Sequence, residues 1–288
     1  MVASMKLTNP VRNYPRAAVL VALILMVVGT GGCKKLQARD LLNKGVAAFK
    51  NAQYDAAIED FKKAKELDPD LVNARLYLAT AYATQYIPGA PSAENVNRGL
   101  AAIQEYKDVL SNEKTKDNLN AIDGIGSILF QMSGSPYDPK KFEESKTYHK
   151  RHIELKPDDP EPYYWVGVID WTLAFRGNAE LRAAYNRDST KKPVKDTEPL
   201  PAQLRQDYAA KYNDLIQEGL QSLEKAIQLR PDYDDAMAYL NLIYRRKADT
   251  VETEQEREQL LQRADALVDK VKEIKQRKLE KGPEQQSE

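Results

Sequence analysis

Apolar residues recur three and four positions apart along most of the chain, from Ala38 to about Leu279. This spacing follows the 3.6-residue period of an α-helix, and no stretch sustains the alternation of a β-strand. Proline or glycine falls between the periodic segments, where such residues end one element and begin the next. The pattern therefore predicts an all-α chain built from a succession of helices.

Small and aromatic residues stand at fixed spacing near the start of this region. Gly45 lies on one predicted helix. Ala57, Phe61 and Ala64 lie on the next, at offsets of four and seven that place them on one face. Pro69 then ends the second helix, because proline disfavours helical geometry in the residue before it. The small side chains predict a close antiparallel approach of the two helices.

This arrangement, from Leu41-Leu42-x-x-Gly45 to Leu67-Asp68-Pro69, resembles one complete tetratricopeptide repeat. The signature of that repeat is about 34 residues long. It runs from an apolar residue and glycine on the first helix to alanine, an aromatic residue, alanine and proline on the second. The resemblance implies a right-handed solenoid of antiparallel helix pairs, in which the first helix of each pair lines a concave face.

The block that ends the first repeat recurs twice. Ala64–Pro69 is matched by His152–Pro157 and by Ala226–Pro231, at spacings that are not multiples of the repeat length. Insertions must therefore separate some of the helices. A shared core needs at least about three repeats, and five helix pairs of uneven quality fit the region 38–249. The insertions are expected near 87–92, 133–139 and 177–201, and the polar composition of Asn186–Pro201 favours a mobile loop.

A single long helix is predicted over residues 250–281, followed by a disordered tail at 282–288. Its apolar residues form one stripe, which a capping helix would use to cover the exposed end of the solenoid. The alternative is a coiled-coil arm for a partner, although its heptads are fewer than the about three or four that such an arm needs. The stripe consists of Leu260, Ala264, Leu267, Val271 and Ile274.

The N-terminus has the features of an export signal. A basic stretch precedes twelve uninterrupted apolar residues, Ala17–Val28, and a short glycine-rich segment leads from there to Cys33, the single cysteine. A helix of that length is shorter than the roughly 30 Å core of a bilayer, which favours cleavage over a retained anchor. Residues 1–32 are therefore predicted to be a signal peptide that is removed before Cys33.

Thr30-Gly31-Gly32-Cys33 resembles the lipobox of bacterial lipoproteins, although that family usually has leucine followed by alanine or serine at the first two positions. The resemblance implies that Cys33 is lipidated, and acyl chains hold a protein on a membrane without a spanning helix. Lys34 and Lys35 follow, where the family's inner-membrane retention signal has aspartate. The expected location is therefore the bacterial cell envelope, at the outer membrane and facing the periplasm. The alternative is an ordinary signal-peptide cysteine or a free thiol.

The charge balance argues against a nucleic-acid partner. The chain carries 43 basic and 43 acidic side chains, and removing residues 1–32 leaves 40 bases against 43 acids. Nucleic-acid binding draws most of its affinity from clustered lysine and arginine. A mildly acidic body is therefore expected to bind no nucleic acid.

Catalytic motifs are scarce. The two histidines, His149 and His152, lie three apart on a predicted helix, and a hydrolase would need them in a compact cluster with Asp170. The zinc-binding His-Glu-x-x-His run and the glycine loops that bind nucleotides are both missing from the sequence. Asp158-Asp159 and Asp234-Asp235 each open a helix, where capping explains them. The chain is therefore predicted to be a non-enzyme with no cofactor and no metal.

The remaining candidate is the concave face that the resemblance implies. Aromatic and arginine side chains most often anchor protein partners, although ordinary packing between repeats is an equal alternative for Phe49, Phe130 and Trp171. Chaperone-adaptor members of the family clamp a carboxylate with polar groups where this chain has Leu42 and Val46, so that ligand is not expected. The predicted partner-binding groove consists of Leu42, Val46, Phe49, Lys50, Asn73, Leu76, Thr80, Phe130, Gln131, Tyr164, Val168, Trp171, Arg245 and Arg246.

Two functions from different classes remain open. The first is a lipid-anchored scaffold that holds another envelope protein in its groove. Its architecture is similar to that of tetratricopeptide lipoproteins which serve outer-membrane, secretion or pilus assembly. The second is an accessory protein that binds a small ligand or glycan in an aromatic pocket around Tyr163, Tyr164, Trp165 and Trp171.

Overall fold

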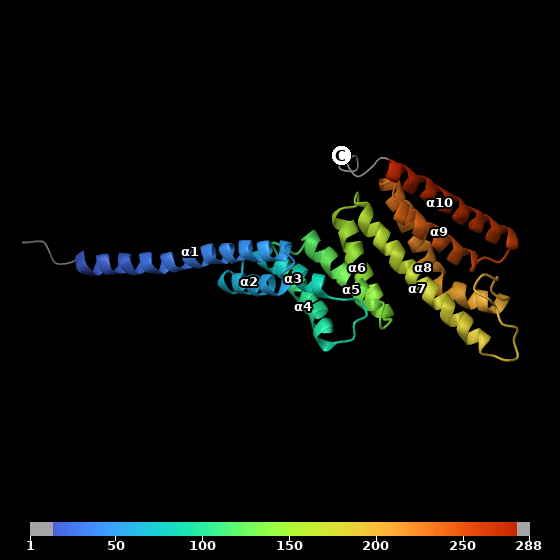
Figure 1. The fold of residues 1–288 in the computed structure, drawn as a ribbon, viewed down its shortest axis with the longest axis horizontal. Coiled ribbons are helices and arrows are strands. Elements are labelled where there is room, and N and C mark those ends of the chain that lie inside the picture. Colours follow the sequence, from blue (N-terminus) through green and yellow to red (C-terminus); the bar gives the residue numbers. More distant parts are fainter. Residues whose placement is uncertain (1–13, 281–288) are drawn as a thin grey trace, which may run out of the picture. The chain divides into compact units, whose positions relative to one another are not determined.

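The structure is a computed structural model that describes residues 14–280, with side chains from Gly32 onward. Within that range the chain forms ten helices and no β-strand, which confirms the all-α prediction (Figure 1). The helices are α1 (Tyr14–Lys50), α2 (Tyr54–Leu67), α3 (Val72–Gln85), α4 (Ala93–Leu110), α5 (Leu119–Ser133), α6 (Pro139–Leu155), α7 (Pro160–Asn186), α8 (Ala202–Leu229), α9 (Asp234–Ala248) and α10 (Glu254–Glu280).

Side-chain caps set the start of several helices. Asn118, Asp138 and Asp159 accept hydrogen bonds from backbone N–H groups in the first turns of α5, α6 and α7. Each cap satisfies a donor that the helix itself leaves without a partner. The capping role predicted for Asp159 is confirmed, whereas Asp234 and Asp235 lie inside the first turn of α9 and follow its N-cap.

The chain divides into two compact units, Met1–Gln85 and Tyr86–Glu288. In the first unit α2 packs against both α1 and α3. Gly45 lies on α1 against the ring of Phe61, and a Cβ atom at Gly45 would come within 2.5 Å of that ring. The core of the unit consists of Ala57, Ile58, Phe61, Leu78 and Ala81.

In the second unit each helix from α4 to α10 packs on the next along the chain, and α7 also contacts α9. Gly126 and Gly167 repeat the role of Gly45, because they lie against His149 and Leu223 of the following helices. Helices α3 and α4 fall in different units, since α3 packs on α2 and α4 packs on α5. The domain boundaries as a whole stay a prediction.

The longest helix pair of the second unit is α7 and α8, joined by the loop 187–201. Helix α7 continues to Asn186, so residues 177–186 extend the helix instead of interrupting it. Arg182 is buried and donates hydrogen bonds to the carbonyl oxygens of Lys195 and Glu198, at 2.6 and 3.0 Å. The second half of this polar segment is therefore tied to α7, while residues 189–193 are exposed.

Helix α10 lies along α9, as Figure 1 shows in red and orange. Ala264 and Ile274 of its apolar stripe are buried, and Leu267 packs on the core of the second unit. The stripe is thus covered by the chain itself, as expected of a capping helix, and is not free for a coiled-coil partner.

Two predicted terminal segments fall partly or wholly beyond this description. Residues 1–13 of the predicted signal peptide and the predicted tail at 282–288 lie outside the described residues. Across the part that is described, no helix has the length and apolar character needed to span a membrane. Cys33 has an exposed free thiol on α1.

Candidate functional site

The first helices of the pairs in the second unit, α5, α7 and α9, share a row of aromatic rings. On α7, Tyr164, Trp171 and Phe175 lie on one side of the helix because they are separated by seven and four residues. The sequence therefore places three rings along one face of one helix. The ring of Tyr239 on α9 meets two of them.

Ring contacts join these side chains into one continuous chain. Tyr239 lies 5.7 Å from Tyr164 and 5.3 Å from Trp171, in edge-to-face geometry. Trp171 stacks on Phe175 at 5.2 Å. Trp165 connects Tyr164 to Phe130 of α5, at 5.3 and 5.1 Å. We call this row the aromatic ladder; it consists of Phe130, Trp165, Tyr164, Tyr239, Trp171 and Phe175.

The aromatic ladder is fixed on one side and accessible on the other. Tyr164, Trp171 and Tyr239 pack against the core cluster that contains Leu240 and Ile243. Phe175 is 43% exposed, and the other five rings are half-buried. Rings held in place by a core and still open to solvent lose little freedom on binding, which is typical of residues that anchor protein partners.

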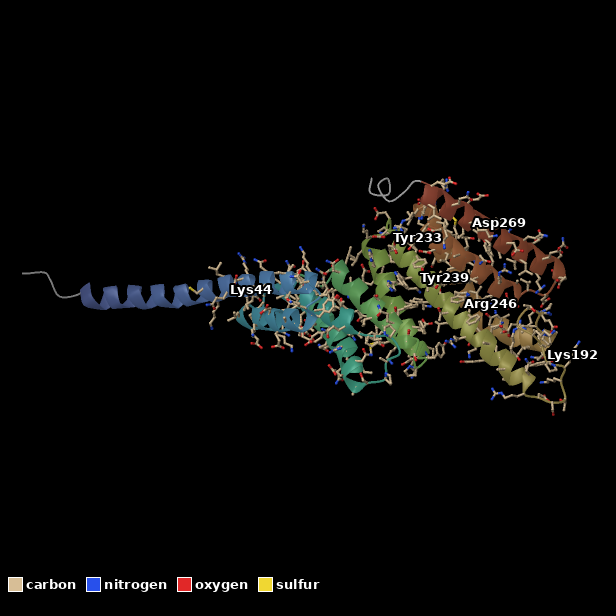
Figure 2. The ribbon with its side chains drawn as sticks, in the orientation of Figure 1. Lys44, Lys192, Tyr233, Tyr239, Arg246 and Asp269 are labelled. Atoms are coloured by element: carbon tan, nitrogen blue, oxygen red, sulfur yellow. The ribbon has the colours of Figure 1, made fainter. Side chains whose placement is uncertain are left out.

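Charged residues lie beside the aromatic ladder at the start and near the end of α9. Arg246 lies over the ring of Phe175, with its guanidinium carbon 5.9 Å from the centroid. In the middle of the aromatic ladder, burial and the charge of Asp235 at the start of α9 raise the pKa of Tyr239. Tyr233 immediately precedes α9, and Tyr239 and Arg246 follow along that helix (Figure 2). The face therefore has an acidic end near Asp235 at the start of α9, whereas Arg246 near the end of α9 is paired with Asp249 at 3.2 Å.

Glu161 lies near the acidic end but is already engaged. Its carboxylate accepts hydrogen bonds from Arg230 Nη1 and from the Tyr233 hydroxyl, both at 2.7 Å. Burial raises the pKa of Tyr233, and this hydrogen bond to Glu161 adds to the effect. The charge of Glu161 is thus largely balanced by Arg230.

The predicted groove residues of the second unit fall into three groups. Phe130, Tyr164 and Trp171 belong to the aromatic ladder, and Arg246 lies at its end. Val168 is 1% exposed and belongs to the core, so it presents no surface to a partner. The other two are held within the chain: Gln131 donates to Ser127 Oγ at 3.4 Å, and Arg245 forms an ion pair with Asp265 of α10 at 2.5 Å.

The predicted groove residues of the first unit are mostly packing residues. Leu42, Val46 and Phe49 pack against the core around Phe61. Leu76 and Thr80 are half-buried, and the Thr80 hydroxyl donates to the Leu76 carbonyl at 2.8 Å. The exposed members are Lys50 and Asn73. A partner contact at any of these residues stays a prediction.

Sequence reasoning missed Phe175 and Tyr239, and named Trp165 only as part of a pocket. Phe175 could have been found, because it lies one helical turn after Trp171. Tyr239 could not, since its place depends on how α9 packs across α7. The side chains named for that pocket point to different neighbours: the Tyr163 hydroxyl donates to the Pro157 carbonyl at 3.2 Å, and Trp165 stacks on His149 at 5.9 Å.

The groups named for a hydrolase are held by separate partners. His149 is buried, and burial lowers its pKa to about 4. His152 Nδ1 lies 2.7 Å from Asp123 Oδ1, while Asp170 pairs with Lys146. Among the described residues, no group of three or more histidine, cysteine or carboxylate side chains could hold a metal ion.

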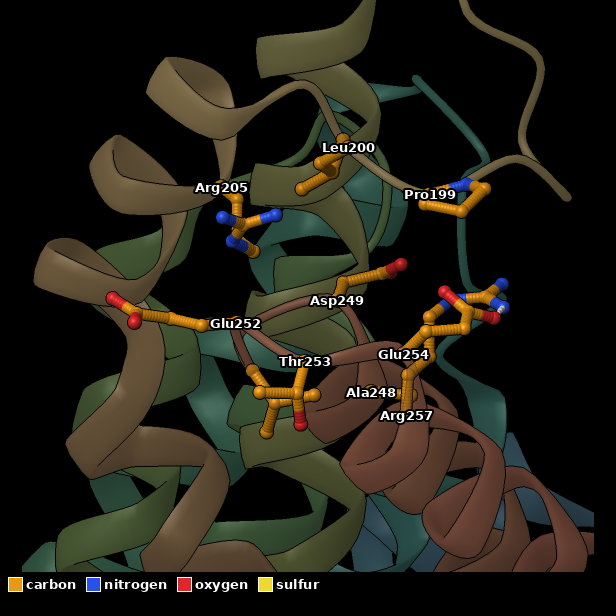
Figure 3. A pocket seen from close by; sticks show the side chains of 10 residues that line it. Pro199, Leu200, Arg205, Ala248, Asp249, Glu252, Thr253, Glu254 and Arg257 are labelled. Carbon is orange, nitrogen blue, oxygen red and sulfur yellow. Dashed lines mark hydrogen bonds and ion pairs between the residues drawn. The ribbon is translucent and has the colours of Figure 1, made fainter.

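A small cleft lies where the loop 187–201 meets the start of α10 (Figure 3). Arg205 and Arg257 line it, and the Nε atom of each is buried without a hydrogen-bond partner. Asp249, Glu252 and Glu254 line the same cleft. The acidic groups offset the two arginines, so the cleft has no excess of positive charge for an anion.

Comparison with known proteins identifies one repeat and the fold. Residues 38–71 match the tetratricopeptide repeat family. No curated protein matches the chain in sequence. The crystal structure of MamA protein is similar at a TM-score of 0.54 and 16% identity, covering 85% of this chain and 94% of that one.

A second solved structure, MamA 41-end from Desulfovibrio magneticus RS-1, is similar at a TM-score of 0.53 and 14% identity. The similarity covers 83% of this chain and 96% of that one. At these identities the likeness concerns the fold alone. Together with the matched repeat, it confirms the predicted fold class, a tetratricopeptide-type solenoid of helix pairs.

Proposed function

We propose that this protein is a non-enzymatic scaffold that binds a segment of a protein partner across the aromatic ladder. The observation that carries the proposal is the row of rings on α5, α7 and α9, packed on the core by one side and accessible on the other. Aromatic side chains dominate the centres of protein interfaces. The tetratricopeptide-type fold supports the same function, since such solenoids present the first helices of their pairs to partners.

The partner is expected in the bacterial cell envelope, with the scaffold held on the outer membrane by lipid on Cys33. This part of the proposal is supported by the sequence of residues 17–33 and by the exposed thiol of Cys33. Replacing Cys33 by serine should remove acyl-chain labelling and release the protein from the membrane fraction. A protein that fractionates identically with and without Cys33 would show that the lipid anchor is wrong.

The binding function is tested by cross-linking in the native host, identifying the captured protein, and measuring its affinity with purified components. Phe175→Ala removes the most exposed ring of the aromatic ladder without emptying the core. Leu155→Ala is the matched control, because Leu155 of α6 is 41% exposed and lies outside the aromatic ladder. We expect Phe175→Ala to weaken binding roughly tenfold or more and Leu155→Ala to leave it unchanged. Equal affinities for both variants would refute binding at this face.

A further inference from the structure

Asp235 is an exposed carboxylate at the acidic end of this face, at the start of α9. It lies in the first turn of α9, four residues before Tyr239 and therefore on the same side of that helix. Burial raises the pKa of Tyr164, and the charges of Asp235 and Glu161 add to this effect. The negative field of Asp235 thus reaches two neighbouring rings of the aromatic ladder.

Two neighbouring carboxylates are neutralised within the chain. Asp234 forms an ion pair with Lys278 of α10 at 2.7 Å, and Glu161 pairs with Arg230. Among residues 32–280, none pairs with Asp235. This end of the face therefore keeps one uncompensated negative charge beside Tyr164 and Tyr239.

Cations already occupy the rings on either side of this pair. The ring of Tyr233 lies 5.1 Å from the ring of Tyr164. Arg230 lies over Tyr233, with its guanidinium carbon 4.3 Å from the Tyr233 centroid. Arg246 lies over Phe175 at 5.9 Å. Within the described part of the chain, no lysine or arginine lies over Tyr164 or Tyr239. A cation within about 6 Å of a ring face is attracted by the ring quadrupole.

We propose that the partner segment inserts a lysine or arginine side chain at this end, where it lies against Tyr164 and Tyr239 and pairs with Asp235. The inference rests on the proposed function and specifies its partner. Apolar side chains of the same segment contact Trp171 and Phe175, where the cation over Phe175, Arg246, is already paired with Asp249 at 3.2 Å. The charge of Asp235 beside Tyr164 and Tyr239, with apolar contacts at Trp171 and Phe175, therefore fixes the direction of the bound segment.

The test uses a library of random twelve-residue peptides displayed on phage and selected on the full purified chain. The wild type is expected to enrich peptides that combine one lysine or arginine with aromatic or aliphatic residues. Asp235→Asn should still enrich apolar peptides but lose the preference for a basic residue. Glu258→Gln, at an exposed acidic residue of α10, is the control for net charge and should behave as the wild type.

A selected peptide is then synthesised with its basic residue intact or replaced by norleucine. We expect the replacement to weaken binding to the wild type roughly tenfold, and to have little effect on binding to Asp235→Asn. Affinity for the intact peptide should fall with added salt, because the contact is partly exposed. Enriched peptides without a basic residue, or equal losses in both proteins, would overturn this inference and leave the binding function standing. A failure to enrich any peptide, together with no effect of Phe175→Ala, would overturn both.

Discussion

Lys146 Nζ lies 2.8 Å from Asp170 Oδ1, and this buried ion pair joins α6 to α7. Glu218 of α8 lies 3.2 Å from the same ammonium group, so the charges connect three consecutive helices. Burial raises the pKa of Asp170 to about 7, although Lys146 opposes the shift. The remaining carboxylate oxygen of Asp170 has no hydrogen-bond partner among the described residues.

Replacing Lys146 by methionine should destabilise the second unit by about 3 kcal/mol, because it leaves a buried carboxyl group without its counter-charge. The double variant Lys146→Met, Asp170→Leu should recover most of that loss. Lys107→Met is the control, since Lys107 and Glu144 form an exposed pair at 3.3 Å that should contribute less than about 1 kcal/mol. Urea unfolding measures the free energy of unfolding of all three variants and of the wild type. Losses that simply add in the double variant would show that the two groups are not coupled.

Gly167→Ala should destabilise the second unit by about 1–3 kcal/mol, because the added methyl group would overlap the buried side chain of Leu223. Gly134→Ala is the matched control, since nothing lies within 4 Å of a Cβ atom at Gly134. The temperature at the midpoint of thermal unfolding is measured for both variants and for the wild type. A similar midpoint for both variants would mean that α7 and α8 are not in close contact at Gly167.

These glycines show what could be predicted from the sequence. Gly45, Gly126 and Gly167 were recognisable because each packs on a helix of its own repeat, close along the chain. The ring contact between Trp171 and Tyr239 could not be predicted, because it joins two helices that are separated in the chain by α8 and the loop 187–201. The composition of a loop also does not show which side chains donate to its backbone carbonyls. The hydrogen bonds from Arg182 to the polar segment could therefore not be predicted.

Replacing Arg182 by methionine should free the loop 187–201 from α7. Arg182 donates to two partly buried loop carbonyls and also pairs with Asp249, so its loss leaves the two carbonyls without that donor. We expect trypsin to cleave after Lys191 several-fold faster, because local opening exposes the backbone. Arg187→Met is the control, since Arg187 is exposed and donates only to Ala183 of its own helix. Unchanged cleavage in Arg182→Met would show that other contacts hold the loop.

The acid sensitivity of the second unit should depend on His149. Burial lowers the pKa of His149 to about 4, below its usual value of 6.5. Below pH 6.5 the unfolded chain therefore binds a proton that the folded chain does not, so stability is full above pH 6.5 and falls as the pH drops toward 4. Between pH 7.5 and pH 5 this loss amounts to about 2 kcal/mol. His149→Gln keeps a side chain of similar size that does not titrate, and should lose about 2 kcal/mol less than the wild type over that interval. Urea unfolding at the two pH values measures the loss of stability in each protein. The contribution of the carboxylates is common to both proteins and cancels when the two losses are subtracted. An equal loss in both would mean that His149 is solvated and titrates alike in the folded and unfolded chain.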